Sequence, residues 1–154
     1  MLLRKAERRY KLTTHDYAEL AAFRRALREF MRFSEQAAAE AGLTSRHYQA
    51  MLVLRACPEG RHVTINDLAG ELLIKHNSAV ELVDRLVASG LVARAASATD
   101  RRKVELRLTA RGRQVLAKLA AVHRVELVRL GPGLRRFFAE ISRAPEDAVK
   151  GAGR

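Results

Sequence analysis

The side chains that could carry catalysis or bind a metal are few and scattered. The five histidines are His15, His47, His62, His76 and His123. No two of them have His-x-x-His spacing and none lies beside a pair of carboxylates, and the sequence has no Cys-x-x-Cys motif. This pattern predicts no metal site. The sequence also lacks a Gly-x-Ser-x-Gly elbow and a phosphate-binding glycine loop. We therefore expect a protein that is not an enzyme and needs no cofactor.

Cys57 is the only cysteine, so no internal disulfide can form and a reduced, cytoplasmic setting is expected. The thiol has two interpretations, a redox sensor or a buried structural residue. Its place at the end of a predicted helix, just before Pro58, favours the structural one.

Positive charge dominates the 154 residues, which have the length of a single domain with a core of its own. Lys and Arg number 29 against 17 Asp and Glu, giving a formal charge of +12 and a pI near 11.0. Such an excess indicates an anionic partner. Most of the cations are Arg, whose planar guanidinium suits phosphates and guanine edges, although genomic base composition explains Arg usage equally well. No stretch reaches the roughly 18 uncharged residues of a membrane span, so membrane insertion is not expected.

Hydrophobic periodicity predicts the elements that position the remaining polar groups. Apolar residues at spacings of three and four predict helices over residues 13–42 and 44–58, and Thr13 or Thr14 can cap the first of them. Thr64 and Asp67 form a capping-box pattern that opens a helix over 65–72. A further amphipathic helix covers 76–89, with Gly90 as its C-terminal stop. The last two helices form a candidate helix-turn-helix.

Alternation replaces the helical period after Gly90. Residues 91–96 and 104–109 read as two strands of a β-hairpin whose tip carries Asp100, Arg101, Arg102 and Lys103. A helix-turn-helix followed by such a hairpin is a winged helix. Thr109 then caps a long helix that we expect to be interrupted at Gly131-Pro132-Gly133, before a last short helix that ends near residue 141. Residues 143–154 read as a flexible tail.

The order of these motifs resembles the multiple antibiotic resistance regulator (MarR) family. The resemblance covers about residues 14–142 and rests on Asp67-Leu68-Ala69, Val83-Asp84-Arg85-Leu86, Gly90-Leu91-Val92, Arg94, Asp100-Arg101-Arg102 and Leu108-Thr109 with Gly112. It implies one domain, mainly α with a small β-hairpin. Residues 61–109 would form the winged-helix region, and residues 14–60 and 110–142 the helices of a homodimer.

The resemblance also implies a function and a set of contact residues. It implies a regulator of transcription, a repressor, that binds a pseudo-palindromic operator in double-stranded DNA. The helix over 76–89 would enter the major groove, and Arg101 or Arg102 the minor groove. The implied DNA contacts are His76, Asn77, Ser78, Val80, Glu81, Arg85, Arg101, Arg102 and Lys103. Ser78 and Asn77 at a helix N-terminus suit phosphates and base edges on physical grounds as well.

Several of these residues keep a second interpretation. Asp67 either orients the wing by bracing Arg101 or Arg102, or simply caps its helix. Arg85 either touches phosphate or pairs with an acid such as Asp84. Glu81 can accept from cytosine, but an ion pair with a neighbouring cation is favoured.

Two further features bear on function. Family members often bind small aromatic or phenolic acids, so the resemblance implies a candidate lining of Phe23, Phe30, His47, Tyr48 and Met51; a core stripe is the alternative for these residues. Leu73 stands where the family commonly has Gly, so we expect the turn to close without a positive φ or Leu73 to pack inward. Together with Glu81, it keeps open a winged-helix interaction module that binds nucleic acid non-specifically or binds a protein.

Overall fold

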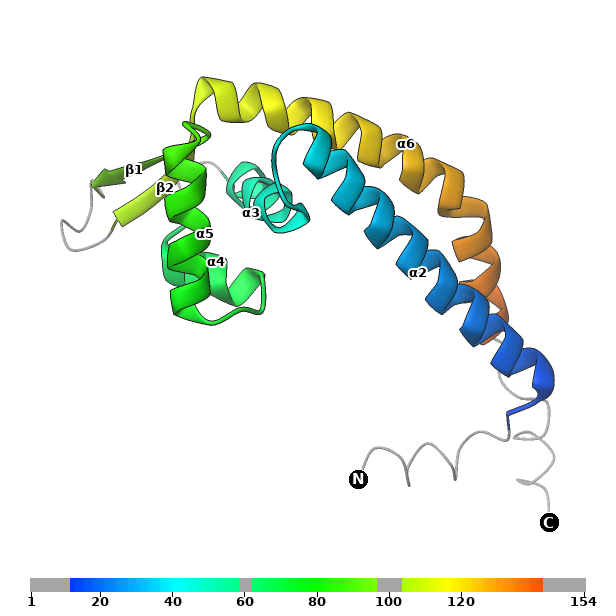
Figure 1. The fold of residues 1–154 in the computed structure, drawn as a ribbon. Coiled ribbons are helices and arrows are strands. Elements are labelled where there is room, and N and C mark those ends of the chain that lie inside the picture. The colour runs from blue at the N-terminus through cyan, green and yellow to red at the C-terminus, as the bar shows by residue number, and fades with distance from the viewer. Residues whose placement is uncertain (1–11, 59–61, 97–103, 143–154) are drawn as a thin grey trace, which may run out of the picture. The chain divides into compact units, whose positions relative to one another are not determined.

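The computed structural model describes residues 12–58, 62–96 and 104–142. The chain divides into two compact units, one made of residues 1–32 and 125–154 and the other of residues 33–124. The elements in chain order are α2 (Thr14–Glu40), α3 (Ser45–Ala56), α4 (Ile65–Glu71), α5 (His76–Ala88), β1 (Val92–Ala96), β2 (Val104–Leu108) and α6 (Ala110–Ile141) (Figure 1). The predicted fold class, mainly helical with one small hairpin, is confirmed.

The first unit consists of the N-terminal part of α2 and the C-terminal part of α6. Thr13 caps α2 through Asp16, whose Oδ2 accepts from the Thr13 amide at 2.7 Å and from its hydroxyl at 2.8 Å. These hydrogen bonds lower the pKa of the Asp16 carboxyl. Phe23 of α2 stacks on Phe137 of α6 with ring centroids 4.4 Å apart, and this aromatic contact holds the two helical segments together.

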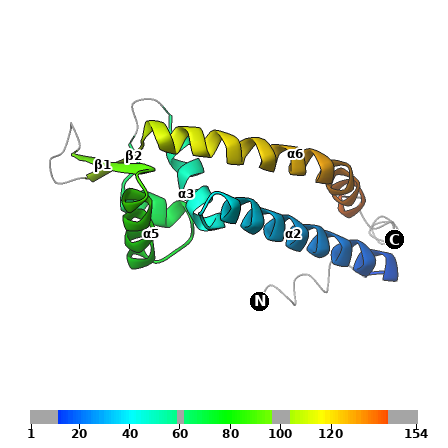
Figure 2. The same ribbon diagram turned by 45° about the horizontal axis from the view of Figure 1, so that its top comes forward.

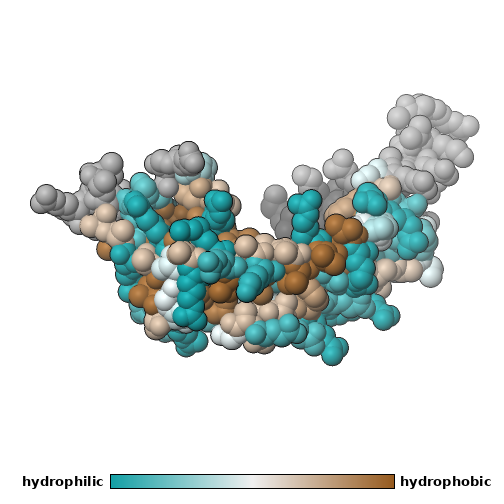
Figure 3. All heavy atoms as spheres, turned by 90° about the horizontal axis from the view of Figure 1, so that it is seen from above, coloured by the Kyte–Doolittle hydropathy of each residue, from teal (hydrophilic) through white to brown (hydrophobic). Residues whose placement is uncertain are grey.

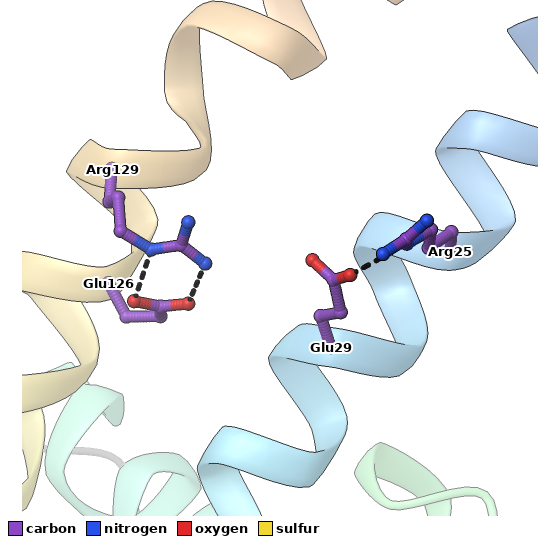
Figure 4. A network of polar contacts seen from close by, with 4 residues as sticks. All are labelled: Arg25, Glu29, Glu126 and Arg129. Carbon is purple, nitrogen blue, oxygen red and sulfur yellow. Dashed lines mark hydrogen bonds and ion pairs between the residues drawn. The ribbon is translucent and has the colours of Figure 1, made fainter.

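Charged side chains accompany the aromatic contact. Glu29 accepts from Arg25 on α2 at 2.9 Å, and Glu126 accepts two hydrogen bonds from Arg129 on α6, at 2.9 and 2.6 Å (Figure 4). The bonds from Arg129 lower the pKa of the Glu126 carboxyl. In return, Glu126 first and Glu29 to a lesser degree raise the pKa of Arg129.

The expected interruption at Gly131-Pro132-Gly133 is wrong, because α6 is one helix with Pro132 inside it. A proline removes one helical hydrogen bond and crowds the carbonyl four residues earlier, at a cost of about 3 kcal/mol. The apolar stripe nevertheless continues across it, from half-buried Leu130 and Leu134 to buried Phe137. The stacking of Phe137 on Phe23 fixes the helix beyond Pro132 and offsets part of that cost.

The second unit contains α3, α4, α5, the hairpin and the adjoining parts of α2 and α6. Its core is built from buried faces of each element, among them Met51, Leu68, Val83, Leu86, Leu106 and Leu116. β1 and β2 pair antiparallel, with Val92 opposite Leu108 and Ala96 opposite Val104. The hairpin extends beside α5 in both ribbon views (Figures 1 and 2).

Thr109 and Gly112 fasten the base of the hairpin to α6. The Thr109 hydroxyl donates to the Gly90 carbonyl at 2.8 Å and accepts from the Gly112 amide at 2.9 Å, which confirms Thr109 as the cap of α6. Gly112 is buried against the backbone of Leu91, and a Cβ at this position would collide with the Leu91 carbonyl. Only glycine fits there.

Leu73 closes the turn between α4 and α5 in a way that contradicts the expectation. Its φ is +52° and its side chain is 92% exposed, so it adopts the left-handed conformation and does not pack inward. Its amide donates to the Gly70 carbonyl at 3.2 Å, and the Ile74 amide donates to the Ala69 carbonyl at 3.0 Å. These two bonds are the Schellman pattern, which requires a positive φ at this position whatever residue occupies it.

Candidate nucleic-acid interface

Helix α5 has one buried and one exposed face. Ala79, Leu82, Val83 and Leu86 are buried in the core. The opposite face carries His76, Asn77, Ser78, Glu81 and Arg85 as exposed residues, with Val80 half-buried at its edge. Every α5 residue predicted from the sequence to contact DNA therefore lies on or beside one polar surface, which we call the α5 face.

The start of α5 leaves its first amide groups uncapped. The N-cap residue is Lys75, which makes no side-chain capping hydrogen bond. Unsatisfied amides at a helix N-terminus, together with the helix dipole, favour an anion. The Nδ1 atom of His76 lies 2.7 Å from Oδ1 of Asn66, so the ring is held against α4 and is part of a fixed surface.

Glu81 and Arg85 on the α5 face form no ion pair with the described residues. The acid next to Arg85, Asp84, pairs instead with Arg94 on β1 at 2.6 Å, and no described cation pairs with Glu81. The expected pairing of Glu81 with a neighbouring cation is therefore not seen in this part of the chain. The face presents one acid and one base to solvent.

Asp67 caps α4 as the capping-box pattern predicts. Its Oδ2 accepts from the amide of Thr64 at 2.8 Å and from the hydroxyl of Thr64 at 2.7 Å. Arg101, Arg102 and Lys103 lie outside the described residues, so the bracing of an arginine by Asp67 stays a prediction.

The base of the hairpin contains an acid that the sequence reasoning missed. Glu105 on β2 is only 2% exposed, and its Oε2 lies 3.1 Å from His62 Nδ1 and 3.0 Å from Arg107 Nη2. Strand alternation places Glu105 and Arg107 on one face, which was visible in the sequence. The sequence did not show that His62, from a separate segment, covers this face.

The residues suggested for an effector site fall into different surroundings. Phe23 and Phe30 belong to the first unit, where Phe23 stacks on Phe137. Tyr48 and Met51 are buried in the core of the second unit, which agrees with the alternative interpretation of these two residues as core. Burial raises the pKa of the Tyr48 hydroxyl.

His47 caps α3 from its third position. Its Nδ1 accepts from the Thr44 amide at 3.1 Å, so the proton of the neutral ring belongs on Nε2, which is buried with no hydrogen-bond partner among the described residues. Burial, and then the charge of Arg85, lower the pKa of His47. The ring is therefore held neutral beside the α5 helix.

His123 is a further residue whose role was missed. It is buried on α6, and its ring stacks on Tyr48 with centroids 4.0 Å apart. Its Nε2 lies 2.9 Å from the Ser34 hydroxyl and its Nδ1 lies 2.7 Å from the Leu119 carbonyl. A buried histidine with both nitrogens engaged is structural, and the sequence showed only its place on an apolar stripe.

Cys57 is half-buried and lines two cavities in the second unit. One, of about 300 Å³, also touches Arg55, His62 and Arg107; the other, of about 710 Å³, lies along α3 and α4. The described residues contain no cluster of three metal-ligating side chains and no helix apolar and long enough to cross a membrane.

The helix-turn-helix with its antiparallel hairpin defines a winged-helix protein. Residues 41–103 match the model of the MarR family, which confirms the family resemblance found in the motifs. A comparison with curated proteins gives no match.

The same fold occurs in solved regulators. AbsC, a MarR family transcriptional regulator from Streptomyces coelicolor, is 24% identical with a TM-score of 0.64, covering 92% of this chain and 89% of AbsC. MepR of Staphylococcus aureus, in its complex with DNA, is 18% identical with a TM-score of 0.63, covering 78% and 88%. MarR of E. coli is 15% identical with a TM-score of 0.62, covering 87% and 100%.

Proposed function

We propose that this protein is a sequence-specific DNA-binding regulator of transcription, a repressor that acts in the cytoplasm as a homodimer on a pseudo-palindromic operator. The observation that carries the proposal is the α5 face, an exposed polar surface with uncapped amides beside a projecting hairpin. A surface helix of this kind fits the major groove. The DNA complex of the structurally similar MepR supports the same assignment.

Charge and specificity have separate sources in this proposal. The α5 face itself carries both Glu81 and Arg85, so the excess of +12 serves phosphate contacts and steering. His76, Asn77 and Ser78 read bases. Binding then falls steeply as the salt concentration rises.

Selection of bound fragments from random genomic DNA tests the proposal. Recovery of one inverted repeat, with half-sites about 10 bp apart, is the expected result. Retention of DNA without regard to sequence supports instead the alternative, a non-specific interaction module, which the exposed acid Glu81 on the α5 face favours.

The wing is tested by a double substitution, Arg101→Ala with Arg102→Ala. We expect at least a tenfold loss of operator affinity in a titration followed by fluorescence anisotropy, because an arginine in the minor groove meets a strong negative potential. Arg24→Ala with Arg28→Ala on α2 removes the same charge from exposed positions elsewhere and is the matched control. Equal losses in both variants would refute the wing assignment.

The homodimer is supported by apolar side chains that the first unit leaves in solvent. Met31 is 62% exposed, Val125 71% and Val128 69%. On the surface seen in Figure 3, hydrophobic side chains emerge between hydrophilic ones. Exposed apolar groups of this size indicate a protein interface. Sedimentation equilibrium should show a dimer, and Val128→Lys should shift it toward the monomer.

Relief of repression by a small aromatic or phenolic effector completes the proposal. Because Phe23 and Phe30 belong to the other unit and Met51 is fully buried, the candidate contacts in the second unit are His47 and Tyr48. Salicylate added to the operator complex is expected to release the DNA. Tyr48→Phe removes the hydroxyl of Tyr48, and release from this variant should then require a higher concentration of salicylate.

A further inference from the structure

The face of β2 that points away from the core holds a buried carboxylate. Leu106 is buried in the core, and its neighbour Glu105, which alternation directs to the opposite face, is still only 2% exposed. The residue opposite Glu105 on β1 is Ala95, which has no polar side chain. A carboxylate out of water is costly unless cations or donors surround it, so the contacts of Glu105 are the reason it can be there.

Those contacts connect the hairpin to another part of the second unit. Arg107 belongs to the same strand, but His62 comes from the connection between α3 and α4. The next residue in that connection, Val63, accepts a backbone hydrogen bond from the Leu106 amide at 2.8 Å. Glu105–His62 and Val63–Leu106 are thus two adjacent attachments of β2 to the segment that leads into α4.

Among the described residues, one other ion pair attaches the hairpin, and its side chains are more exposed than that of Glu105. Arg94 on β1 pairs with Asp84 on α5 at 2.6 Å, with side chains 37% and 54% exposed. Exposed ion pairs of this kind stabilise little. The Glu105 side chain is 3% exposed, so water screens its contacts far less.

We propose that Glu105 is a positioning residue for the wing: through His62 and Arg107 it fixes β2 against the segment leading into α4, in the orientation that DNA binding requires. The role rests on the proposed function. Glu105 touches no DNA in this proposal and acts by holding the hairpin. Its loss leaves two basic side chains facing each other and frees the Val63–Leu106 attachment.

Hydrogen exchange tests the attachment without DNA. Glu105→Gln keeps the size of the side chain and removes its charge. We expect exchange of the Leu106 amide to accelerate at least tenfold, with exchange in the core of α5 unchanged. Asp84→Asn is the control, because it breaks the exposed attachment only. Unchanged exchange at Leu106 would overturn the proposal.

DNA binding tests the consequence. Glu105→Gln should weaken binding to the selected repeat at least tenfold while leaving binding to random DNA unchanged. Glu29→Gln makes the same change of charge on α2, where Glu29 is exposed, and should not weaken either. Faster exchange without a selective loss of affinity would reduce Glu105 to a structural role and overturn the positioning role.

A double-substitution cycle with His62→Gln identifies the route. If Glu105 acts through His62, the two losses of specific affinity are less than additive; additive losses contradict that route. His62→Gln alone also serves if Glu105→Gln does not fold. Failure of the wild-type protein to select any DNA would overturn the proposed function and the positioning role together, whereas the exchange result would still decide whether Glu105 holds the hairpin.

Discussion

Replacing Leu73 by glycine should stabilise the protein. A non-glycine residue in the left-handed region costs about 1–2 kcal/mol, and Leu73 has a φ of +52°. The side chain is 92% exposed, so its removal loses almost no buried apolar area. Glycine loses more conformational entropy on folding, which opposes the gain by about 0.5–1 kcal/mol. The difference predicts a gain of about 0.5–1 kcal/mol for Leu73→Gly.

Urea unfolding followed by circular dichroism, at one fixed protein concentration, measures this gain. Leu73→Ala is the matched control, because alanine removes the same exposed side chain but keeps the Cβ that makes a positive φ costly. The glycine variant should therefore be more stable than both the wild type and the alanine variant. Equal free energies of unfolding for Leu73→Gly and Leu73→Ala would refute backbone strain at Leu73 as the source of the gain.

Three further predictions concern caps, proline and pH. Thr64→Ala removes the cap of α4 and should cost about 1 kcal/mol in thermal unfolding; Thr64→Ser, which keeps the hydroxyl, should cost clearly less, and equal losses would count against the cap. Pro132→Ala restores a helical hydrogen bond in α6 and should stabilise the protein by about 1–3 kcal/mol. A lower melting midpoint for this variant than for the wild type would contradict the prediction. Burial lowers the pKa of His47 in the folded protein, so as the pH falls the unfolded chain takes up this proton at a higher pH than the folded protein does. Wild-type stability should therefore fall as the pH drops below about 6.5. Gln keeps an acceptor for Thr44 and does not titrate, so the free energy of unfolding of His47→Gln should fall less over the same range; parallel curves would exclude His47 as the source.

Local signals in the sequence predict the elements well. The Thr64–Asp67 pair and the cap residue Thr109 mark helix starts that the structure reproduces, because a cap depends on residues only about three apart. Gly42 and Gly90, both with positive φ, end the helices before them as predicted.

The two errors arise where the preference of a single residue is outweighed, once by a tertiary contact and once by the backbone hydrogen bonds of a turn. Pro132 was expected to end a helix, but Phe23 stacks on Phe137 beyond it, from a residue more than a hundred positions away in the chain. Leu73 was expected to avoid a positive φ, but the two hydrogen bonds of the turn demand one. The first reason lies outside any local window of sequence, whereas the second is a pair of backbone hydrogen bonds within residues 69–74 that residue preference alone does not reveal.

The candidate site shows the same division. The period of 3.6 residues sorted the α5 residues correctly into a buried and an exposed face. The same local reading found neither His62 beside Glu105 nor Ser34 beside His123, since 43 and 89 residues separate these partners. Burial of a charged or polar group is decided by the packing of distant segments.

The close approach of Gly112 to the Leu91 carbonyl has a mechanical consequence. With no space for even a methyl group between them, and with Thr109 bonded to Gly90, the first turn of α6 and the start of β1 cannot slide past each other. They form one rigid joint within the second unit. The base of the hairpin and the first turn of α6 can therefore change orientation only together.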